Sequence, residues 1–377
     1  MKILHLITHF DLGGAERVAA NIAASPTAGM EYHVLEIMRG SSAYTPKFIS
    51  ELRAAGVRCH RSWMPDVQFH FLFERIAALL FPLRMLFVML RLRPDVVHTH
   101  TETPDLALYV CCRLMPWLFR RVRVVRTIHN TCLWTGLPRT ATCVERFFQQ
   151  RRANIAISAS VLESYSARFG SEPPIIHNGV ASVPQEPFFA ASPEEVTSAA
   201  SATTSRPIEI LFAGRFEPQK GVDMLCQVVK ALRDDARYRF TIAGDGSLRS
   251  LVERELGSLP NVSVLSPIFS LATYMSSFDY LFMPSLFEGL SMLSMEASMN
   301  GLPVIANACP GLADTLPPTW SLLARSGTLE EYMHIFRSVI PGVSHDALAD
   351  EAYVYASQHF SIRTMQLRYE QVYAARC

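Results

Sequence analysis

The stretch Tyr280-Leu-Phe-Met-Pro-Ser-Leu-Phe-Glu-Gly-Leu-Ser-Met-Leu-Ser-Met-Glu296 runs from an apolar strand pattern through a loop into a helix. Ser291 is the candidate N-cap of that helix, Glu288 lies on the loop, and Glu296 falls more than one turn into the helix. We expect both carboxylates to flank the helix mouth, where free N–H groups from about Leu290 to Leu293 can receive a phosphate. Carboxylates accept hydrogen bonds from hydroxyls, so Glu288 suits a sugar and Glu296 a ribose. The alternative is a surface acid plus a glutamate on a helix face.

The same alternation of short apolar runs and helical patterns extends along the chain and predicts stacked strand–helix units around parallel sheets. In the first half, the predicted strands span residues 2–8, 32–38, 95–100, 123–128, 155–158 and 174–177. A second series covers residues 208–213, 239–243, 262–266, 280–283 and 303–306. Because the pattern restarts, the sequence predicts two similar α/β domains.

The domain boundaries follow from composition. We expect an N-terminal domain over 1–185, a linker over 186–206 that is rich in Ala, Ser, Thr and Pro, and a C-terminal domain over 207–360. A short helix over 193–201 is possible within the linker. The closing segment, 361–377, has a helical period and needs a surface to cover.

The composition excludes two classes of protein. With 49% hydrophobic and 18% charged residues, the chain can fill folded cores and is not a disordered protein. Its formal net charge of +1 argues against a nucleic-acid binder. The charge is uneven, however, because the first 190 residues hold 21 Lys and Arg against 14 Asp and Glu, and the remainder holds 14 against 20.

The eight cysteines show no C-x-x-C pair, which favours reduced thiols over a disulfide framework or a zinc site. The first residues are too weakly apolar for a secretory signal. We therefore expect a cytoplasmic protein.

Polar groups follow several of the predicted strands, at the edge where open parallel sheets bind ligands. Gly13-Gly14 permits a tight turn before a helix whose free N–H groups would attract an anion, although a plain turn is an equal alternative. Arg215 and Lys220 lie five residues apart on a loop and could neutralise a diphosphate; the alternative is two solvated cations.

Two common nucleotide fingerprints fail. Gly244-Asp-Gly246 has Arg249 where a dinucleotide motif needs a third glycine, and Gly13-Gly14 has no G-x-G-x-x-G frame. No Walker-type Gly-Lys-Ser/Thr sequence follows a strand. Hydride transfer and nucleoside-triphosphate hydrolysis are therefore disfavoured.

Several short motifs follow one another along the chain in a characteristic order. They are Gly13-Gly14-Ala-Glu16, Pro94-Asp-Val-Val-His-Thr-His100, Ile176-His-Asn-Gly179, Phe212-Ala-Gly-Arg215 with Lys220-Gly221, Ile242-Ala-Gly-Asp-Gly246, and the E-x7-E signature of Glu288 and Glu296. Over nearly its whole length the chain resembles the retaining nucleotide-sugar glycosyltransferases of the family-four type. The resemblance implies the GT-B fold, with two facing Rossmann-like domains, parallel sheets and a cleft between them. It also implies that the last helix crosses back onto the first domain.

The resemblance assigns roles to individual residues. Arg215 and Lys220 would hold the donor diphosphate, Glu288 the hydroxyls of the transferred sugar, Glu296 the ribose, and His129 the sugar near its anomeric carbon. The remaining donor-site residues, which would contribute mostly backbone groups, are Gly13, Gly14, Gly244, Leu290, Ser291 and Met292.

No metal or other cofactor is expected to be obligatory, because fixed cations already supply positive potential. His98 and His100 are expected to alternate in direction on their strand, so that at most one reaches the ligand. A metal site built from them would lack a matching carboxylate.

The chain also departs from the family pattern. Gly-Leu-Ser-Met follows Glu288 where many relatives have Gly-Phe-Gly, and the stretch from Thr315 to Trp320 lacks the usual glycine-bearing turn. Sugar and acceptor specificity therefore stay open.

A strongly apolar segment over 69–93 is interrupted by Glu74, Arg75 and Arg84, so it does not predict a transmembrane helix. Basic and apolar residues alternate there and over 117–123, which suits an anionic membrane surface. A buried helix with snorkelling arginines is the equal alternative.

The sequence thus predicts an enzyme that moves a sugar from a nucleoside-diphosphate donor to a hydroxyl acceptor with retained configuration. The expected acceptor is a growing or lipid-linked surface polysaccharide, with possible peripheral attachment to the inner face of the cytoplasmic membrane. The alternatives are a nucleotide-sugar epimerase of the same fold and a catalytically silent scaffold.

Overall fold

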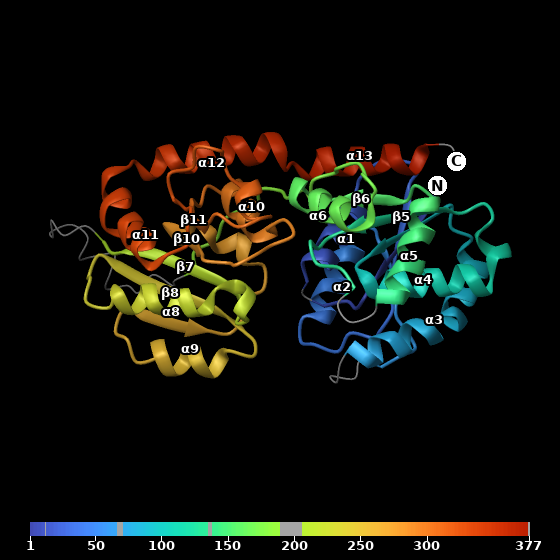
Figure 1. Ribbon diagram of the computed structural model, residues 1–377, viewed down its shortest axis with the longest axis horizontal. Coiled ribbons are helices and arrows are strands. Elements are labelled where there is room, and N and C mark those ends of the chain that lie inside the picture. The colour runs from blue at the N-terminus through green and yellow to red at the C-terminus, as the bar shows by residue number, and fades with distance from the viewer. Residues whose placement is uncertain (12, 66–70, 135–137, 189–205, 376–377) are drawn as a thin grey trace. The chain divides into compact units, whose positions relative to one another are not determined.

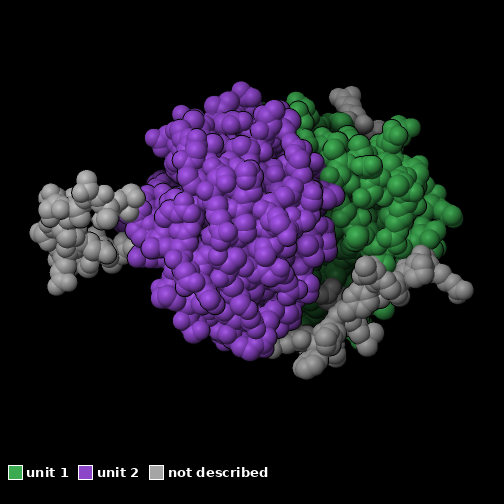
Figure 2. Space-filling view, turned by 60° about the vertical axis from the view of Figure 1, so that its left-hand side comes forward, with its two compact units in different colours: residues 1–179, 360–377 green, residues 180–359 purple. Residues whose placement is uncertain are grey.

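The computed structural model describes residues 1–377 except residue 12 and the segments 66–70, 135–137, 189–205 and 376–377 (Figure 1). The chain forms two compact units, which Figure 2 shows in different colours. Unit 1 contains residues 1–179 and 360–377, and unit 2 contains residues 180–359. Most of the predicted linker, with its possible helix over 193–201, lies outside the described residues.

Unit 1 is built on a six-stranded parallel sheet in the order β3-β2-β1-β4-β5-β6. Its strands are β1 (Lys2–Ile7), β2 (Glu31–Glu36), β3 (Arg58–His60), β4 (Val96–His100), β5 (Arg123–Ile128) and β6 (Asn154–Ala156). Its helices are α1 (Gly14–Ala23), α2 (Thr45–Ala54), α3 (Phe71–Leu92), α4 (Glu102–Leu114), α5 (Pro138–Gln150), α6 (Ala159–Phe169) and α13 (Ile362–Ala374). The central strands are almost wholly buried and so lack the regular alternation of a half-exposed strand, although β4, Val-Val-His-Thr-His, includes three polar residues.

Unit 2 repeats this architecture with a second six-stranded parallel sheet in the order β12-β11-β10-β7-β8-β9. Its strands are β7 (Ile208–Arg215), β8 (Tyr238–Asp245), β9 (Val262–Leu265), β10 (Tyr280–Met283), β11 (Val304–Asn307) and β12 (Leu323–Ala324). The helices include α8 (Val222–Ala231), α9 (Arg249–Leu256), α10 (Met292–Met299), α11 (Leu329–His334) and α12 (His345–His359). The prediction of two α/β domains on parallel sheets is confirmed.

The strand order reverses beside the first strand of each sheet, between β1 and β4 in unit 1 and between β7 and β10 in unit 2. Ligands of open α/β sheets bind beyond the carboxyl ends of the strands at such a switch point. The loops that follow these strands are therefore where a binding site is expected.

The predicted strand over 174–177 is wrong. Ile175 forms only an isolated bridge with Ala156, and the preceding Pro173-Pro174 pair has no N–H groups to donate to a ladder. The short strands β3 and β12 were not predicted, because two or three residues are too few to show a period.

The last helix, α13, packs against α1 within unit 1. The Gln366 side-chain amide donates to the Asn21 carbonyl at 2.7 Å, and the Gly179 N–H donates to the Met365 sulfur at 3.0 Å. Tyr369 and Tyr373 are buried on the same helix. The apolar period of this segment is thus used to close the unit's own core.

Candidate active site

In unit 2, the loops after β7 and β10 bring an ammonium group and a carboxylate together. Lys220 follows β7 at the end of a short 3₁₀ turn, and Glu288 follows β10. Lys220 Nζ lies 2.6 Å from Glu288 Oε1, with side-chain exposures of 19% and 9%. The two charges balance each other, and the pair is largely shielded from water, so Lys220 and Glu288 bind each other strongly. An anionic ligand would compete with Glu288 for Lys220.

Arg215 ends β7 and is exposed. Its Nη2 donates to Gln219 Oε1 at 3.2 Å, while Gln219 Nε2 donates to the Phe287 carbonyl at 3.1 Å. Gln219 therefore ties the Arg215 loop to the loop of Glu288. This bridging role was not predicted, and a single glutamine offers no sequence signal for it.

A glycine after β11 fixes the Glu288 loop. The Glu288 N–H donates to the Pro310 carbonyl at 3.0 Å, and the Ser291 N–H donates to the Gly311 carbonyl at 2.9 Å. Gly311 has φ +75°, and a Cβ there would lie 2.2 Å from the Glu288 carbonyl oxygen. Only glycine fits this position. The Pro310-Gly311 pair was the available signal, since such pairs mark turns.

Ser291 caps α10 as predicted: its hydroxyl accepts a hydrogen bond from the Ser294 N–H at 3.3 Å. Its own N–H, however, already donates to Gly311, so the expectation that this amide is free for a phosphate needs correction. The amides of Leu290 and Met292 stay as candidates. Glu296 lies half-buried within α10, more than one turn from the cap.

Gly244 lies near the end of β8, where a Cβ would stand 2.1 Å from the Gly214 carbonyl oxygen. This glycine lets β7 and β8 stay paired at their carboxyl ends, where Gly244 lies opposite Gly214. Arg249, the residue that breaks the dinucleotide fingerprint, donates from Nη1 to the Gly244 carbonyl at 3.1 Å.

In unit 1, Gly13 is the N-cap of α1 and Gly14 is the first helical residue. A Cβ on Gly13 would lie 2.1 Å from Glu16 Oε2, so the Glu16 carboxylate folds back against the helix N-terminus. An acid there is favourable for the helix. It also means that an incoming anion meets a carboxylate at this turn, which the sequence did not indicate.

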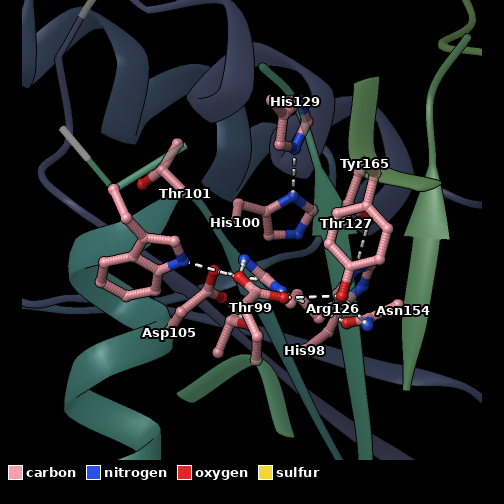
Figure 3. A network of polar contacts seen from close by, with 12 residues as sticks. His98, Thr99, His100, Thr101, Asp105, Arg126, Thr127, His129, Asn154 and Tyr165 are labelled. Carbon is pink, nitrogen blue, oxygen red and sulfur yellow. Dashed lines mark hydrogen bonds and ion pairs between the residues drawn. The ribbon is translucent and has the colours of Figure 1, made fainter. Parts of the chain in front are cut away.

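His129 follows β5 directly and is the end of a chain of three imidazoles, of which Figure 3 shows His129 and His100. His129 Nε2 lies 3.1 Å from His100 Nδ1, and His100 Nε2 lies 3.0 Å from His5 Nδ1. Burial lowers the pKa of His129 and of His5 to about 3. All three rings are therefore neutral near pH 7, because burial also holds the pKa of His100 well below its usual value.

The expectation that His98 and His100 alternate in direction is wrong. Residues two apart on a strand share a face, and the two ring centroids lie 4.2 Å apart. The partners of His98 are Tyr373 Oη and Thr127 Oγ1, each at 2.7 Å, so it anchors α13 to the sheet.

A buried ionic network supports the strand that carries His129 (Figure 3). Arg126 on β5 has Nε 2.6 Å from Asp105 Oδ2 and Nη1 2.6 Å from Glu145 Oε2. Tyr165 Oη and Trp134 Nε1 each donate to Glu145 at 2.6 Å. Burial disfavours the charge on Glu145, but Arg126 outweighs that cost and the pKa of Glu145 is lowered. These contacts link β5 to α4 and α5, and Tyr165 joins α6 to the same network.

His5, His98 and His100 could in principle hold a metal ion, since their ligand atoms lie within 4.8 Å of one another. Five of their six ring nitrogens hydrogen-bond to one another, to His129, or to Tyr373 and Thr127, and His5 Nε2 is buried without a partner. Hydrogen bonds thus occupy most of the possible ligand atoms, and the independence of the reaction from metal stays a prediction.

Two family models match the chain. The Glycosyltransferase Family 4 model matches residues 12–182, and the Glycosyl transferases group 1 model matches residues 207–337. Together they cover most of the sequence, and the chain belongs to the glycosyltransferases that these two models describe.

Individual relatives match more locally. A glycogen synthase of Mycobacterium tuberculosis is 28% identical over 251 residues, which are 59% of this chain and 54% of the relative. An uncharacterised 41.2 kDa protein in the cps region of Klebsiella pneumoniae is 36% identical over 113 residues, 29% of this chain and 30% of that protein. The chain thus spans between about a third and about half of these relatives' length.

Solved structures agree over the full length. HepE from Anabaena, in complex with UDP and glucose, has a TM-score of 0.75 at 19% identity and is covered over 100% of both chains. Sucrose-phosphate synthase from Thermosynechococcus elongatus has a TM-score of 0.72 at 17% identity, covering 99% of this chain and 98% of that one. At such identities the likeness establishes the fold, which is GT-B.

Proposed function

We propose that the protein transfers a sugar from a nucleoside-diphosphate donor to a hydroxyl group of an acceptor, with retention of the anomeric configuration. The observation that carries this proposal is the Lys220–Glu288 pair at the switch point of unit 2, beside the capped N-terminus of α10. Cations and open amides suit a diphosphate, and a carboxylate suits sugar hydroxyls.

Donor binding would separate Lys220 from Glu288. The diphosphate offers Lys220 more negative charge than Glu288 does, so the ammonium can turn to the phosphate while Glu288 accepts hydrogen bonds from the sugar. Arg215 adds a bidentate guanidinium. As the bond to the anomeric carbon breaks, negative charge grows on the leaving diphosphate, and fixed cations stabilise it most at that point.

Gly244 and the amides of Leu290 and Met292 are proposed to line the donor, with Glu296 on its ribose. In unit 1, the neutral His129 is proposed to face the sugar. Its Nε2 is engaged by His100, which leaves Nδ1 as the other polar atom. Gly13 and Gly14 are proposed to contact the diphosphate after the Glu16 carboxylate has moved away from the helix N-terminus.

The name of the Klebsiella relative refers to a cps region, and the Mycobacterium relative is a glycogen synthase. The second name supports a glycan acceptor, and we propose a growing or lipid-linked surface polysaccharide as the acceptor of this chain. We accordingly propose a cytoplasmic enzyme that works at the inner membrane face and attaches there peripherally. Within the described part of the chain, no helix has both the length and the apolarity to span a bilayer.

The test has two stages. Nucleotide sugars are first screened for thermal stabilisation, because a ligand at about 100 times its Kd adds about 2.7 kcal/mol to the free energy of unfolding. The stabilising donor is then incubated with lipid-linked and glycan acceptors, and the anomeric configuration of the product is read by NMR. Inverted product would refute retention. Donor isomerisation without transfer would replace the proposal with an epimerase, and no turnover of any donor would favour a silent scaffold.

A further inference from the structure

Helix α3 of unit 1, labelled in Figure 1, exposes an apolar face between Leu79 and Leu90. The exposed side chains, with accessible fractions between 49% and 64%, are Leu79, Leu80, Leu83, Phe87 and Leu90. They recur at helical spacing, while Ala78, Phe81 and Met85 on the other face are buried. Trp63 continues the exposed surface, since its ring lies 5.2 Å from that of Phe87. Contiguous apolar surface of this kind marks an interaction site.

A basic pocket of about 930 Å³ opens beside the C-terminal half of this helix. The cations that line it are Lys2, Arg58, Arg84 and Arg91, and its apolar wall includes Trp63 and Phe87. The pocket and the exposed face therefore share these two aromatic side chains.

The positive charge in the pocket is largely uncompensated. Among the described lining residues none is acidic, and only Arg58 has a carboxylate at ion-pair distance, Glu31 at 2.8 Å. Arg84 instead donates from Nε to the Arg61 carbonyl at 3.2 Å and lies 5.0 Å over the Trp63 ring. Burial lowers the pKa of His60 to about 4, and the neighbouring Arg84, Arg58 and Arg91 charges add to that shift. The pocket is poised for an anion.

We propose that this pocket binds the phosphate headgroup of an anionic phospholipid while the exposed face of α3 lies among the acyl chains. This proposal rests on the peripheral membrane attachment proposed above and names the residues that would make the attachment. Basic side chains next to an apolar helix face suit a phosphate above hydrocarbon. Trp63, with an apolar body and a polar N–H, fits the boundary between the two.

A second copy of the chain is a poorer occupant. A symmetric dimer through α3 would bring the same pocket from each protomer toward the interface, with four cations on each side. Like charges in an interface oppose association. The charge pattern therefore selects an anionic surface.

The experiment is vesicle flotation of the full chain at low salt, with phosphatidylcholine alone or mixed with phosphatidylglycerol. We expect flotation only with the anionic vesicles and a blue shift of tryptophan fluorescence that Trp63→Phe removes. Arg84→Gln/Arg91→Gln should weaken binding about 5-fold per charge, which is the factor for about 1 kcal/mol per basic residue. Arg233→Gln/Arg254→Gln, which removes two exposed charges from unit 2, is the matched control.

The Leu83→Ser/Leu90→Ser variant changes only exposed apolar side chains of α3. It should abolish flotation without lowering the Tm. Equal flotation of the pocket double variant and wild type would overturn the pocket. So would a monomer–dimer equilibrium, seen by sedimentation, that Leu83→Ser/Leu90→Ser shifts to monomer. Donor-induced thermal stabilisation is measured on the same variants. If it persists while vesicles are ignored, the membrane site fails and the glycosyltransferase proposal stands.

Discussion

The two units share one strand order and differ in what they place on it. Counted from the first strand of each, both sheets run 3-2-1-4-5-6. The third strand is connected to the fourth by the 22-residue helix α3 in unit 1 but by a 3₁₀ segment of 7 residues, Leu271–Ser277, in unit 2. At the switch point, unit 1 carries neutral, buried imidazoles and unit 2 carries an ion pair. The topology therefore fixes where a site lies, and the loops decide its chemistry.

The largest expected difference between the units is in their stability at acidic pH. The imidazoles of His5 and His129 have a pKa of about 3 when folded, against about 6.5 when unfolded. The unfolded chain therefore binds more protons between these values, so stability is lost as the pH falls from about 6.5 toward 3. Each such group contributes about 1.4 kcal/mol per pH unit, and His98 and His100 shift in the same direction.

The measurement is hydrogen exchange and thermal unfolding from pH 7 to pH 4.5. We expect unit 1 to open before unit 2, and the exposed His334→Gln variant to behave as wild type. A Tm that does not change over this range would contradict the burial of neutral imidazoles.

The ion pair of unit 2 is tested by Lys220→Ala. We expect kcat to fall by about 10²–10³-fold, the usual cost of removing one charge-stabilising donor. Stability falls too, because Glu288 loses its partner. Lys220→Ala/Glu288→Gln should recover stability and stay inactive. Lys230→Ala, which removes a surface lysine paired with Glu255, is the control. Full turnover by Lys220→Ala would remove this residue from the site.

The glycine behind Glu288 offers a third test. Gly311→Ala combines a left-handed φ with a clash against the Glu288 carbonyl, so we expect a loss of about 2–3 kcal/mol in unfolding free energy together with reduced activity. Gly301→Ala has nearly the same φ, +73°, with open space around the added Cβ. It should cost about 1 kcal/mol and leave kcat intact. Equal effects of the two variants would show that the contact with Glu288 is unimportant.

The smallest effect is expected at the helix cap. Ser291→Ala removes the hydroxyl that caps α10 and should cost about 1 kcal/mol, with weaker donor binding. Thr328→Ala removes the equivalent cap of α11, whose hydroxyl accepts from the Glu331 N–H. This control should lower the Tm alone. Unchanged donor affinity in Ser291→Ala would separate the cap from the site.

The sequence predicted the two parallel sheets because buried strands are continuous apolar runs, and it grouped Lys220 with Glu288 because both follow strands of one sheet. Short strands were missed, and the strand at Pro174 was wrongly predicted where prolines remove the donors. The Ser291 amide was misjudged, since its partner, Gly311, comes from another loop.

What the sequence determined by itself was local: strand and helix periods, the cap at Ser291, and the charged residues that follow each strand. What only the tertiary structure decided was which of these groups meet. Gln219 joins two loops, His5 reaches His129 through His100, and Arg84 lies over Trp63 beside an exposed helix face. Such contacts join residues far apart in the chain, and side-chain spacing along a strand or helix carries no information about them.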